Sequence, residues 1–418
     1  MKQFYEERRN KLINEKTGPC AICIFSGRAP MRSLDEDYIF SVDRNFFYLT
    51  GLERQNMVLV LKKDVRGVVS ETLYIEPYDA FLAKWVGGRM KKDEAEAVCG
   101  VKDIRSIDRF KEQMNAWFDN VRTQGEVHLF LDLWRTAYMQ QDTEAHRFAH
   151  EVQYEHPNVR IDDVYRDLTI MRLIKGEEEL EQMKIAQKTT KTAVEAMMKH
   201  ARPGMNECEI EGAFDFALMM NGVREKAFPT IVCGGKRATT LHYRDNNQDV
   251  KDGEMILVDL GGTHGHYCAD ISRTFPVNGK FTERQKEIYE TVLAAQDLVI
   301  EKTRAGMTFG EMNQMVIDFY ESRLHDLGLD KDGKTVSDYY YHSVTHSLGL
   351  DCHDPELARR EQVLEPGMVV TVEPGLYIED EGIGVRIEND ILITEDKPID
   401  LSKDILKTVE DIEAHMAR

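Results

Sequence analysis

Two segments of this chain combine an apolar β-hairpin pattern with a pair of acidic residues placed symmetrically about the turn. In the first, the apolar run Met255 to Val258 predicts a buried strand that ends at Asp259. A two-residue turn at His264 and Gly265 would place Asp259 opposite Asp270 on the following strand. Opposed residues of an antiparallel pair share a face of the sheet, so we expect both carboxylates to point the same way.

A second hairpin of this kind is predicted near the end of the sequence. Strands over 368–378 and 383–394 flank a turn around Asp380, and this arrangement places Glu373 opposite Glu388. Two hairpins with facing acids indicate two similar halves that enclose one site. A buried carboxylate is costly unless it is paired or bound to a cation, so four of them require positive charge, which two divalent metal ions would provide.

His346, in the segment THSLGLDCHD, adds an imidazole to this set of carboxylates. Oxygen-rich ligand sets without cysteine suit one or two divalent ions better than a structural zinc ion. Each acid also has a simpler interpretation when it is taken alone. Asp259 could cap a turn at a strand end, Asp270 could form an ion pair with Arg273, and Glu373 could mark the end of a strand. The metal-site hypothesis rests on all of them together.

The motifs DLGG, ADISRTF, HSLGLDCHD, EPGLY and RIEND occur in this order along the chain. In this they resemble the pita-bread metallopeptidases, the family of aminopeptidase P, prolidase, methionine aminopeptidase and creatinase. The resemblance implies a pseudo-symmetric pita-bread catalytic domain and a dinuclear metal site. The implied metal ligands are Asp259, Asp270, His346, Glu373 and Glu388. Mn²⁺ is the usual activator of the family, and these ligand types are also compatible with Co²⁺, Zn²⁺ or Fe²⁺.

The resemblance also implies roles for residues around the metal ions. His242 in TTLHYRDNN and His353 in DCHDP match substrate-binding, catalytic histidines, and His342 matches a further substrate-binding position. His353 would steady the tetrahedral intermediate or pass a proton to the leaving amine. Arg386 matches a catalytic position and Tyr377 a substrate-binding one, and both would hold the metal-bound carboxylates in place. A partly buried histidine with a backbone partner is the alternative for each histidine, and an ion pair with a neighbouring acid is the alternative for Arg386.

The implied reaction is peptide hydrolysis by a hydroxide that bridges two metal ions, with Glu373 as the group that takes the proton from the bridging water. The implied substrates are peptides with proline at the second position. Aminopeptidase P cleaves tripeptides and longer peptides, whereas prolidase (Xaa-Pro dipeptidase) accepts only dipeptides, and their shared ligands do not distinguish them. A creatinase-like amidinohydrolase or a noncatalytic binder on the same fold would lack several ligands, whereas all five are present here.

The sequence before residue 170 differs in pattern from the rest of the chain. Helix-like segments alternate there with short strand-like runs that begin at Cys20, Met57, Glu71 and Glu126. This alternation predicts a small α/β domain over residues 1–170, with a boundary between Asp162 and Glu177, followed by the catalytic domain over 171–418. We expect long helices over 177–201 and 282–302 in the second domain, and a mixed α/β (α+β) fold for the whole chain.

The first domain resembles the N-terminal domain of aminopeptidase P and creatinase in the segments DRNFFYLTGL from Asp43 and AKWVGGRM from Ala83. In that family, neighbouring subunits contribute residues near Asn45 and Phe46 to the substrate pocket, and Trp85 matches a tryptophan that closes the pocket from an adjacent chain. The resemblance therefore implies a homodimer or a homotetramer. The alternative for Trp85 is a core tryptophan.

Composition excludes several other classes of partner. The net charge of −20 over 418 residues, without a basic stripe, disfavours nucleic acid. No apolar run approaches the roughly 20 residues that span a bilayer, and the polar start lacks the apolar core of a secretory signal. Seven scattered cysteines do not indicate a disulfide framework, so we expect a cytoplasmic protein without a membrane partner. Cys268 and Cys352 lie beside site residues and are interpreted as buried apolar filler.

Overall fold

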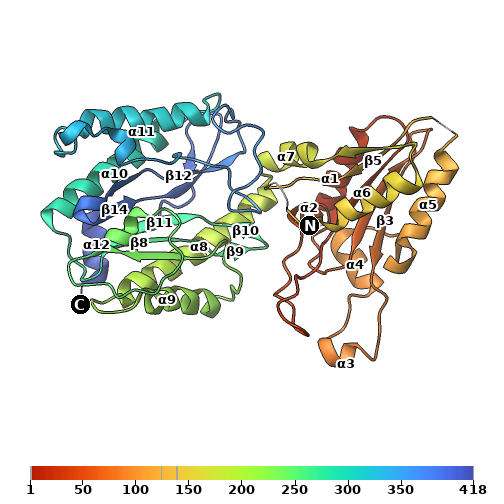
Figure 1. Cartoon of the computed structure of the whole chain (residues 1–418), viewed down its shortest axis with the longest axis horizontal. Helices are drawn as coiled ribbons and strands as arrows, with labels where there is room; N and C mark the ends of the chain where they lie inside the picture. Colours follow the sequence, from red (N-terminus) through yellow and green to blue (C-terminus); the bar gives the residue numbers. More distant parts are fainter. Residues whose placement is uncertain (1, 124, 138–139, 418) are drawn as a thin grey trace. The chain divides into compact units, whose positions relative to one another are not determined.

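The computed structural model describes residues 2–123, 125–137 and 140–417 and forms two compact units, Met1–Thr169 and Ile170–Arg418 (Figure 1). The first unit contains a six-stranded mixed sheet with the strand order β4-β3-β2-β1-β5-β6. Its elements are α1 (Lys2–Asn14), β1 (Cys20–Phe25), α2 (Arg44–Thr50), β2 (Val58–Lys63), β3 (Val69–Ile75), α3 (Ala83–Val86), α4 (Lys92–Cys99), β4 (Ile104–Ser106), α5 (Phe110–Val121), β5 (Val127–Leu131), α6 (Glu144–Glu155) and β6 (Val159–Asp163), followed by α7 (Tyr165–Leu173) across the boundary.

Apolar side chains of α5 and α6 form the core of this unit against the sheet. Phe118 of α5 and Phe148 of α6 belong to one buried cluster with residues of β1, β2, β3 and β5. The four strands predicted from apolar runs are confirmed as β1, β2, β3 and β5. Strands β4 and β6 were not predicted, because β4 has only 3 residues and β6 ends in two aspartates, which are not typical of a buried strand.

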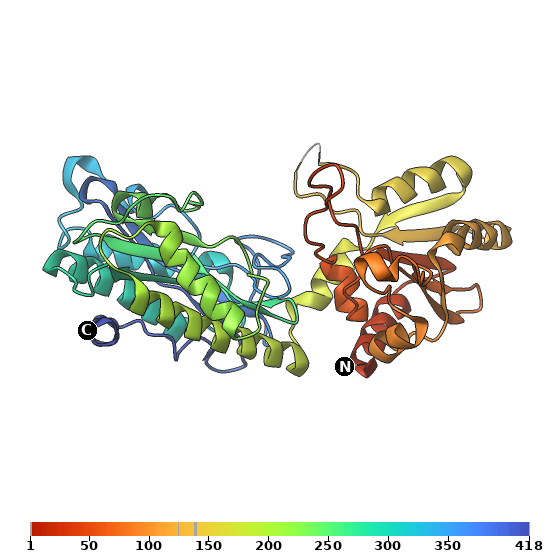
Figure 2. The ribbon, with the colours of Figure 1, turned by 90° about the horizontal axis from the view of Figure 1, so that it is seen from below.

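The second unit consists of two similar halves, each with an acid-bearing hairpin, as the sequence predicts, and each with a pair of long helices, of which the sequence predicted only the first. Figure 1 shows α8 and α9 on one side of the strands and α10 and α11 on the other, and Figure 2 shows the green α8 and α9 from below. The helices are α8 (Glu177–His200), α9 (Glu207–Met220), α10 (Glu283–Lys302), α11 (Phe309–Arg323) and α12 (Val409–Met416). The strands are β7 (Ile231–Gly234), β8 (Met255–Leu260), β9 (Thr263–His264), β10 (Tyr267–Cys268), β11 (Ile271–Pro276), β12 (Val369–Val372), β13 (Gly375–Ile378), β14 (Ile383–Arg386), β15 (Asn389–Leu392) and β16 (Ile399–Asp400).

The register predicted for the first hairpin is wrong by two residues. Asp259 pairs with Ser272 rather than with Asp270, because the turn lies one position later, at Gly265 and His266. Both turn residues have positive φ, 53° and 63°, as a two-residue type I′ turn requires. Because side chains alternate along a strand, a shift of two residues keeps Asp270 on the same face as Asp259, so the predicted common direction is unaffected.

The register predicted for the second hairpin is confirmed. Val372 pairs with Asn389 and Gly375 pairs with Arg386, so Glu373 lies opposite Glu388 between these two ladders. The chain reverses through a short 3₁₀ turn, Glu379–Glu381, as predicted around Asp380. This hairpin therefore presents its two acids directly across from each other.

A fully buried arginine connects the two hairpins. Arg273 of β11 donates hydrogen bonds to the carbonyl oxygen of Glu388 and to Asn389 Oδ1, at 2.5 and 2.8 Å, and further ones to the carbonyls of Ile405 and Leu406. Arg273 therefore does not form the ion pair with Asp270 that the sequence left open as an alternative. Its guanidinium instead fixes the backbone next to a predicted metal ligand.

Both long helices predicted from the sequence are confirmed, and side chains at their N-termini explain where they begin. α8 starts at Glu177, and the Glu179 carboxylate accepts a hydrogen bond from the N–H of Gly176 at 2.9 Å. α10 has a full capping box between Thr282 and Gln285. Within the described residues, no helix combines the length and the apolar character that crossing a membrane requires.

Replacing Thr282 with alanine should lower the free energy of unfolding of the second unit by about 1 kcal/mol, because the Gln285 N–H at the start of α10 loses its acceptor. Urea denaturation monitored by circular dichroism measures the change. Thr192→Ala in the middle of α8 is the matched control. Its exposed hydroxyl bonds only to a carbonyl of its own helix, so this substitution should be nearly neutral, and an equal loss in both variants would contradict the capping role.

Candidate metal centre

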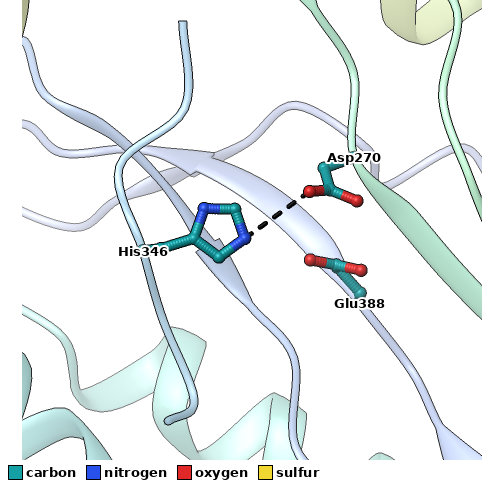
Figure 3. Close-up of side chains that lie close together, drawn as sticks. All are labelled: Asp270, His346 and Glu388. Atoms are coloured by element: carbon teal, nitrogen blue, oxygen red, sulfur yellow. Dashed lines mark ion pairs between the residues drawn. The ribbon is translucent and has the colours of Figure 1, made fainter. Parts of the chain in front are cut away.

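Three of the five predicted metal ligands converge on one point. Asp270 immediately precedes β11, Glu388 lies between β14 and β15, and His346 lies in the segment that runs beside β12 (Figure 3). One ligand atom from each residue lies within 4.8 Å of the others. Residues from both hairpins and from an intervening segment thus form one candidate cation site.

Glu373 belongs to the same cluster through His346. His346 Nε2 lies 3.5 Å from Asp270 Oδ2 and 3.6 Å from Glu373 Oε1. The other ring nitrogen, Nδ1, donates to the carbonyl oxygen of Ser347 at 3.1 Å. This hydrogen bond fixes the ring with Nε2 as the free nitrogen, which is the arrangement that metal-binding histidines use.

Asp259, the fifth predicted ligand, has one oxygen engaged and one available. Arg386 Nη2 donates to Asp259 Oδ2 at 2.6 Å. Asp259 Oδ1 is buried and has no hydrogen-bond partner among the described residues. A buried acceptor without a donor is rare in proteins, so this oxygen is suited to bind a cation.

The electrostatics of the cluster favour a cation. Burial first, and then repulsion by neighbouring carboxylates, raise the pKa of Asp270 and the pKa of Glu373 well above their ordinary values. The same two causes, with Asp259 as the main neighbour, raise the pKa of Glu388 to about 8. A site that disfavours negative charge this strongly, and that offers carboxylate oxygens and an imidazole nitrogen, fits divalent metal ions.

Arg386 and Tyr377 connect the site through a chain of hydrogen bonds. Besides Asp259, Arg386 donates to Ser272 Oγ at 2.8 Å and to the Tyr377 hydroxyl at 3.1 Å. Ser272 donates in turn to Glu388 Oε2 at 2.8 Å. Arg386 thus contacts one predicted ligand directly and a second through Ser272, whereas Tyr377 contacts Arg386 and, through its hydroxyl, His342 Nε2 at 2.8 Å.

The three predicted active-site histidines lie around this cluster in different environments. The ring centroid of His353 is 4.3 Å from that of His346, and His353 is an exposed residue. Burial first, and then the nearby His242, lower the pKa of His353. His342 contacts the Tyr377 hydroxyl through Nε2 at 2.8 Å, and burial followed by Arg386 lowers its pKa to about 3.

His242 lies on the exposed segment between β7 and β8, and its neighbour Tyr243 anchors that segment. The Tyr243 hydroxyl donates to the fully buried carboxylate of Glu207 at 2.9 Å, and Arg237 Nε and the N–H of Gly234 donate to the same carboxylate. Glu207 at the start of α9 therefore fixes the segment that carries His242.

The structure places the remaining predicted site residue in the first unit. Trp85 lies in α3 and is 75% exposed, so the alternative of a core tryptophan is wrong. Asn45 and Phe46 of α2 are instead buried in that unit, where Asn45 Nδ2 donates to Asp132 at 2.6 Å. These two side chains are therefore not available to a substrate pocket.

Three contacts of the cluster were missed from the sequence. Cys352, interpreted as filler, donates from Sγ to Asp270 Oδ2 at 2.9 Å. Ser272 links Arg386 to a predicted ligand, and Asp390 accepts the backbone N–H of Asp270 at 3.0 Å. The motifs ADISRTF and RIEND contain two of these residues, and the strand alternation would have placed Ser272 on the metal-facing side.

Comparison with protein families identifies both units. The description "Metallopeptidase family M24" matches residues 181–395, and "Aminopeptidase P, N-terminal domain" matches residues 5–127. The chain belongs to metallopeptidase family M24. The predicted resemblance to aminopeptidase P and the predicted fold class are confirmed, and the five proposed ligands all lie within the M24 region.

Individual M24 relatives match over nearly the whole chain. The Xaa-Pro aminopeptidase of Escherichia coli is 32% identical over 99% of this chain and 98% of its own length. A solved structure from Bacillus anthracis, assigned as an aminopeptidase P, has a TM-score of 0.95 at 41% identity and covers 99% of this chain and 98% of its own. Aminopeptidase P from Escherichia coli with the inhibitor Pro-Leu has a TM-score of 0.90 at 31% identity and covers 100% and 98%.

Metal binding to the M24 site should release protons. At pH 7, Glu388 with a pKa raised to about 8 is mostly protonated, and a bound cation displaces that proton. Affinity for Mn²⁺ should therefore fall as the pH is lowered from about 8. Calorimetric titration with Mn²⁺ in buffers of different ionisation enthalpy counts the protons released, and a binding heat that does not depend on the buffer would contradict this prediction.

The same raised pKa predicts how the metal-free protein responds to pH. An unfolded glutamate titrates near 4.5, so between about 4.5 and 8 the folded apoprotein binds more protons than the unfolded chain. The stability of the apoprotein should therefore fall as the pH rises through this window. Thermal unfolding of chelator-treated protein at several pH values measures this, and saturating Mn²⁺ serves as the control, because it should weaken the dependence.

Proposed function

We propose that this M24 metallopeptidase is an Xaa-Pro aminopeptidase that releases the N-terminal residue from peptides with proline at the second position. The observation that carries the proposal is the convergence of buried carboxylates and one imidazole in a chain that matches Xaa-Pro aminopeptidases over 99% of its length. The proposed metal ligands are Asp259, Asp270, His346, Glu373 and Glu388. Two Mn²⁺ ions are the proposed cofactors, and a cytoplasmic location and a homo-oligomeric state stay predictions.

When bound, two divalent ions polarise the scissile carbonyl group and lower the pKa of a water molecule, so that a nucleophile is available near neutral pH. Glu373 is the proposed general base that accepts the proton of this water. Its carboxylate lies within the ligand cluster, 3.6 Å from His346 Nε2, where a water molecule held by the site would be in reach.

The histidines act on the peptide itself in this proposal. His353 stands at the exposed border of the cluster, where it can donate a proton to the proline nitrogen as the amine leaves. His242 and His342 bind the substrate, and Tyr377 fixes the orientation of His342 through the 2.8 Å hydrogen bond.

A proline at the second position requires a shaped pocket, because proline lacks the backbone donor that general peptidases use and has a fixed φ. We assign the closing of this pocket to the first domain, residues 1–170, supplied by an adjacent chain in a homodimer or homotetramer. The exposed indole of Trp85 supports this assignment, since a large exposed aromatic side chain suits contact with a ligand or a partner.

Manganese-loaded protein should release the first residue from an Xaa-Pro-Yaa tripeptide, and chelator-treated protein should not. Chromatography of the products, with the matching Xaa-Pro dipeptide in parallel, measures both reactions. Cleavage of the dipeptide alone would make the protein a prolidase. An absence of metal-dependent cleavage of either peptide would refute the proposed function.

Two substitutions should separate metal binding from proton transfer. Asp270→Asn should abolish turnover and weaken Mn²⁺ binding, because it removes a charged ligand from the cluster. His353→Ala should lower kcat by about 10²–10⁴-fold and leave Mn²⁺ affinity nearly unchanged, because the lost group acts on the substrate. Mn²⁺ titration and steady-state kinetics measure the two effects. Full activity of Asp270→Asn would rule out this residue as a metal ligand.

A further inference from the structure

The segment that carries His346 and His353 is folded around the carboxylate of Asp354. Asp354 Oδ1 accepts the backbone N–H of Asp351 at 3.2 Å. Asp354 Oδ2 packs against Gly349, where an added Cβ atom would lie 2.5 Å from this oxygen. The carboxylate therefore occupies the space that any larger residue at position 349 would need. The backbone of the segment packs around this carboxylate.

Two cations from the beginning of the second unit bind this carboxylate. Arg172 Nη2 lies 2.6 Å from Asp354 Oδ1, and Lys175 Nζ lies 3.1 Å from Asp354 Oδ2. The side chains of Arg172, Lys175 and Asp354 are 3%, 1% and 1% exposed, so the ion cluster is shielded from water. Burial alone would raise the pKa of Asp354, but Arg172 and then Lys175 lower it below its ordinary value.

A shared carbonyl oxygen connects this ion cluster to the metal centre. The oxygen of Ser347 accepts the backbone N–H of Asp354 at 2.9 Å and the Nδ1–H of His346 at 3.1 Å. The bond to His346 is the one that directs Nε2 toward the carboxylates. On the other side, Asp354 directly follows His353, so a displacement of Asp354 would move both histidines.

Stability alone is a weak reason for such a cluster, because apolar side chains of similar size often stabilise a core as well as buried ion pairs do. The ions instead fix a position, since Arg172 also binds Asp351 of the same segment at 2.7 Å, and four charged groups that pair with one another restrict the geometry. The residues that this ion cluster holds in place, His346 and His353, belong to the candidate site. A buried ion cluster under an irregular segment thus has the properties of a device that orients catalytic side chains.

We propose that Asp354, bound by Arg172 and Lys175, is a positioning residue that orients His346 for metal binding and His353 for its contact with substrate. The part that concerns His353 rests on the proposed peptidase function. The part that concerns His346 requires only that the cluster binds a divalent ion. Breaking the ion cluster should therefore change metal affinity and turnover together, although none of its members touches the metal or the peptide.

Asp354→Asn is the variant of choice, because it removes the charge and keeps the size of the side chain. We expect Mn²⁺ to bind about 10–100-fold more weakly, the usual effect of removing a group that orients a metal ligand, and kcat to fall more than KM rises. Gly349→Ala, whose Cβ would displace the same carboxylate, should act in the same direction. Arg172→Lys, which keeps the positive charge, should retain more metal affinity than Arg172→Gln.

Glu413→Gln is the matched control. Glu413 of α12 also accepts from a lysine, Lys280, and from a backbone N–H, that of Phe281, at 2.9 and 3.0 Å. A structural role alone would lower the melting temperature in both Asp354→Asn and Glu413→Gln and leave Mn²⁺ affinity and kcat unchanged. That result in folded Asp354→Asn would overturn the proposal.

Two further outcomes are also decisive. If Asp354→Asn does not fold, Gly349→Ala and Lys175→Met provide the same metal titration, and wild-type affinity in both would overturn the proposal. If the wild-type protein binds Mn²⁺ but cleaves no Xaa-Pro peptide, the proposed function fails. Weaker Mn²⁺ binding by Asp354→Asn would still support the positioning of His346 in that case.

Discussion

Repulsion among the buried carboxylates of Asp270, Glu373 and Glu388 is the constraint on which the second unit depends. Two like charges about 4 Å apart repel each other by about 4 kcal/mol at an effective dielectric constant near 20. A few such pairs are comparable with the whole free energy of unfolding of a domain, about 5–15 kcal/mol. The fold can therefore keep these groups together only by protonating them, as their raised pKa values indicate, or by binding cations.

The two buried arginines next to the carboxylate cluster, Arg386 and Arg273, lie beside it rather than within it. Arg386 neutralises one oxygen of Asp259, and Arg273 fixes the backbone of Glu388 through its carbonyl oxygen. Neither guanidinium forms an ion pair with Asp270, Glu373 or Glu388 among the described contacts. The carboxylate oxygens that face one another are thus left for divalent ions, while the two arginines hold the strands that carry them.

The sequence predicted the parts of the site that local patterns determine. The second hairpin has its turn where the sequence places it, so Glu373 and Glu388 were paired correctly. The first was misaligned because the positive φ of His266, unusual for a residue other than glycine, moves the turn by one position. The ion cluster could not be predicted, because Asp354 meets Arg172 from 182 residues away and no local pattern specifies that contact.

The site contains residues on a hairpin and residues on an irregular segment, and these two groups are held in position by different interactions. Hairpin register determines how far Glu373 lies from Glu388, because backbone hydrogen bonds fix the spacing on both sides. His353 has no such ladder, and a catalytic group on an irregular segment is less precisely held than one on a strand. A dry ion cluster directly beside it supplies the missing constraint. Buried charged groups thus serve two purposes around the site: one set is suited to bind ions, and the other holds the histidine segment in place.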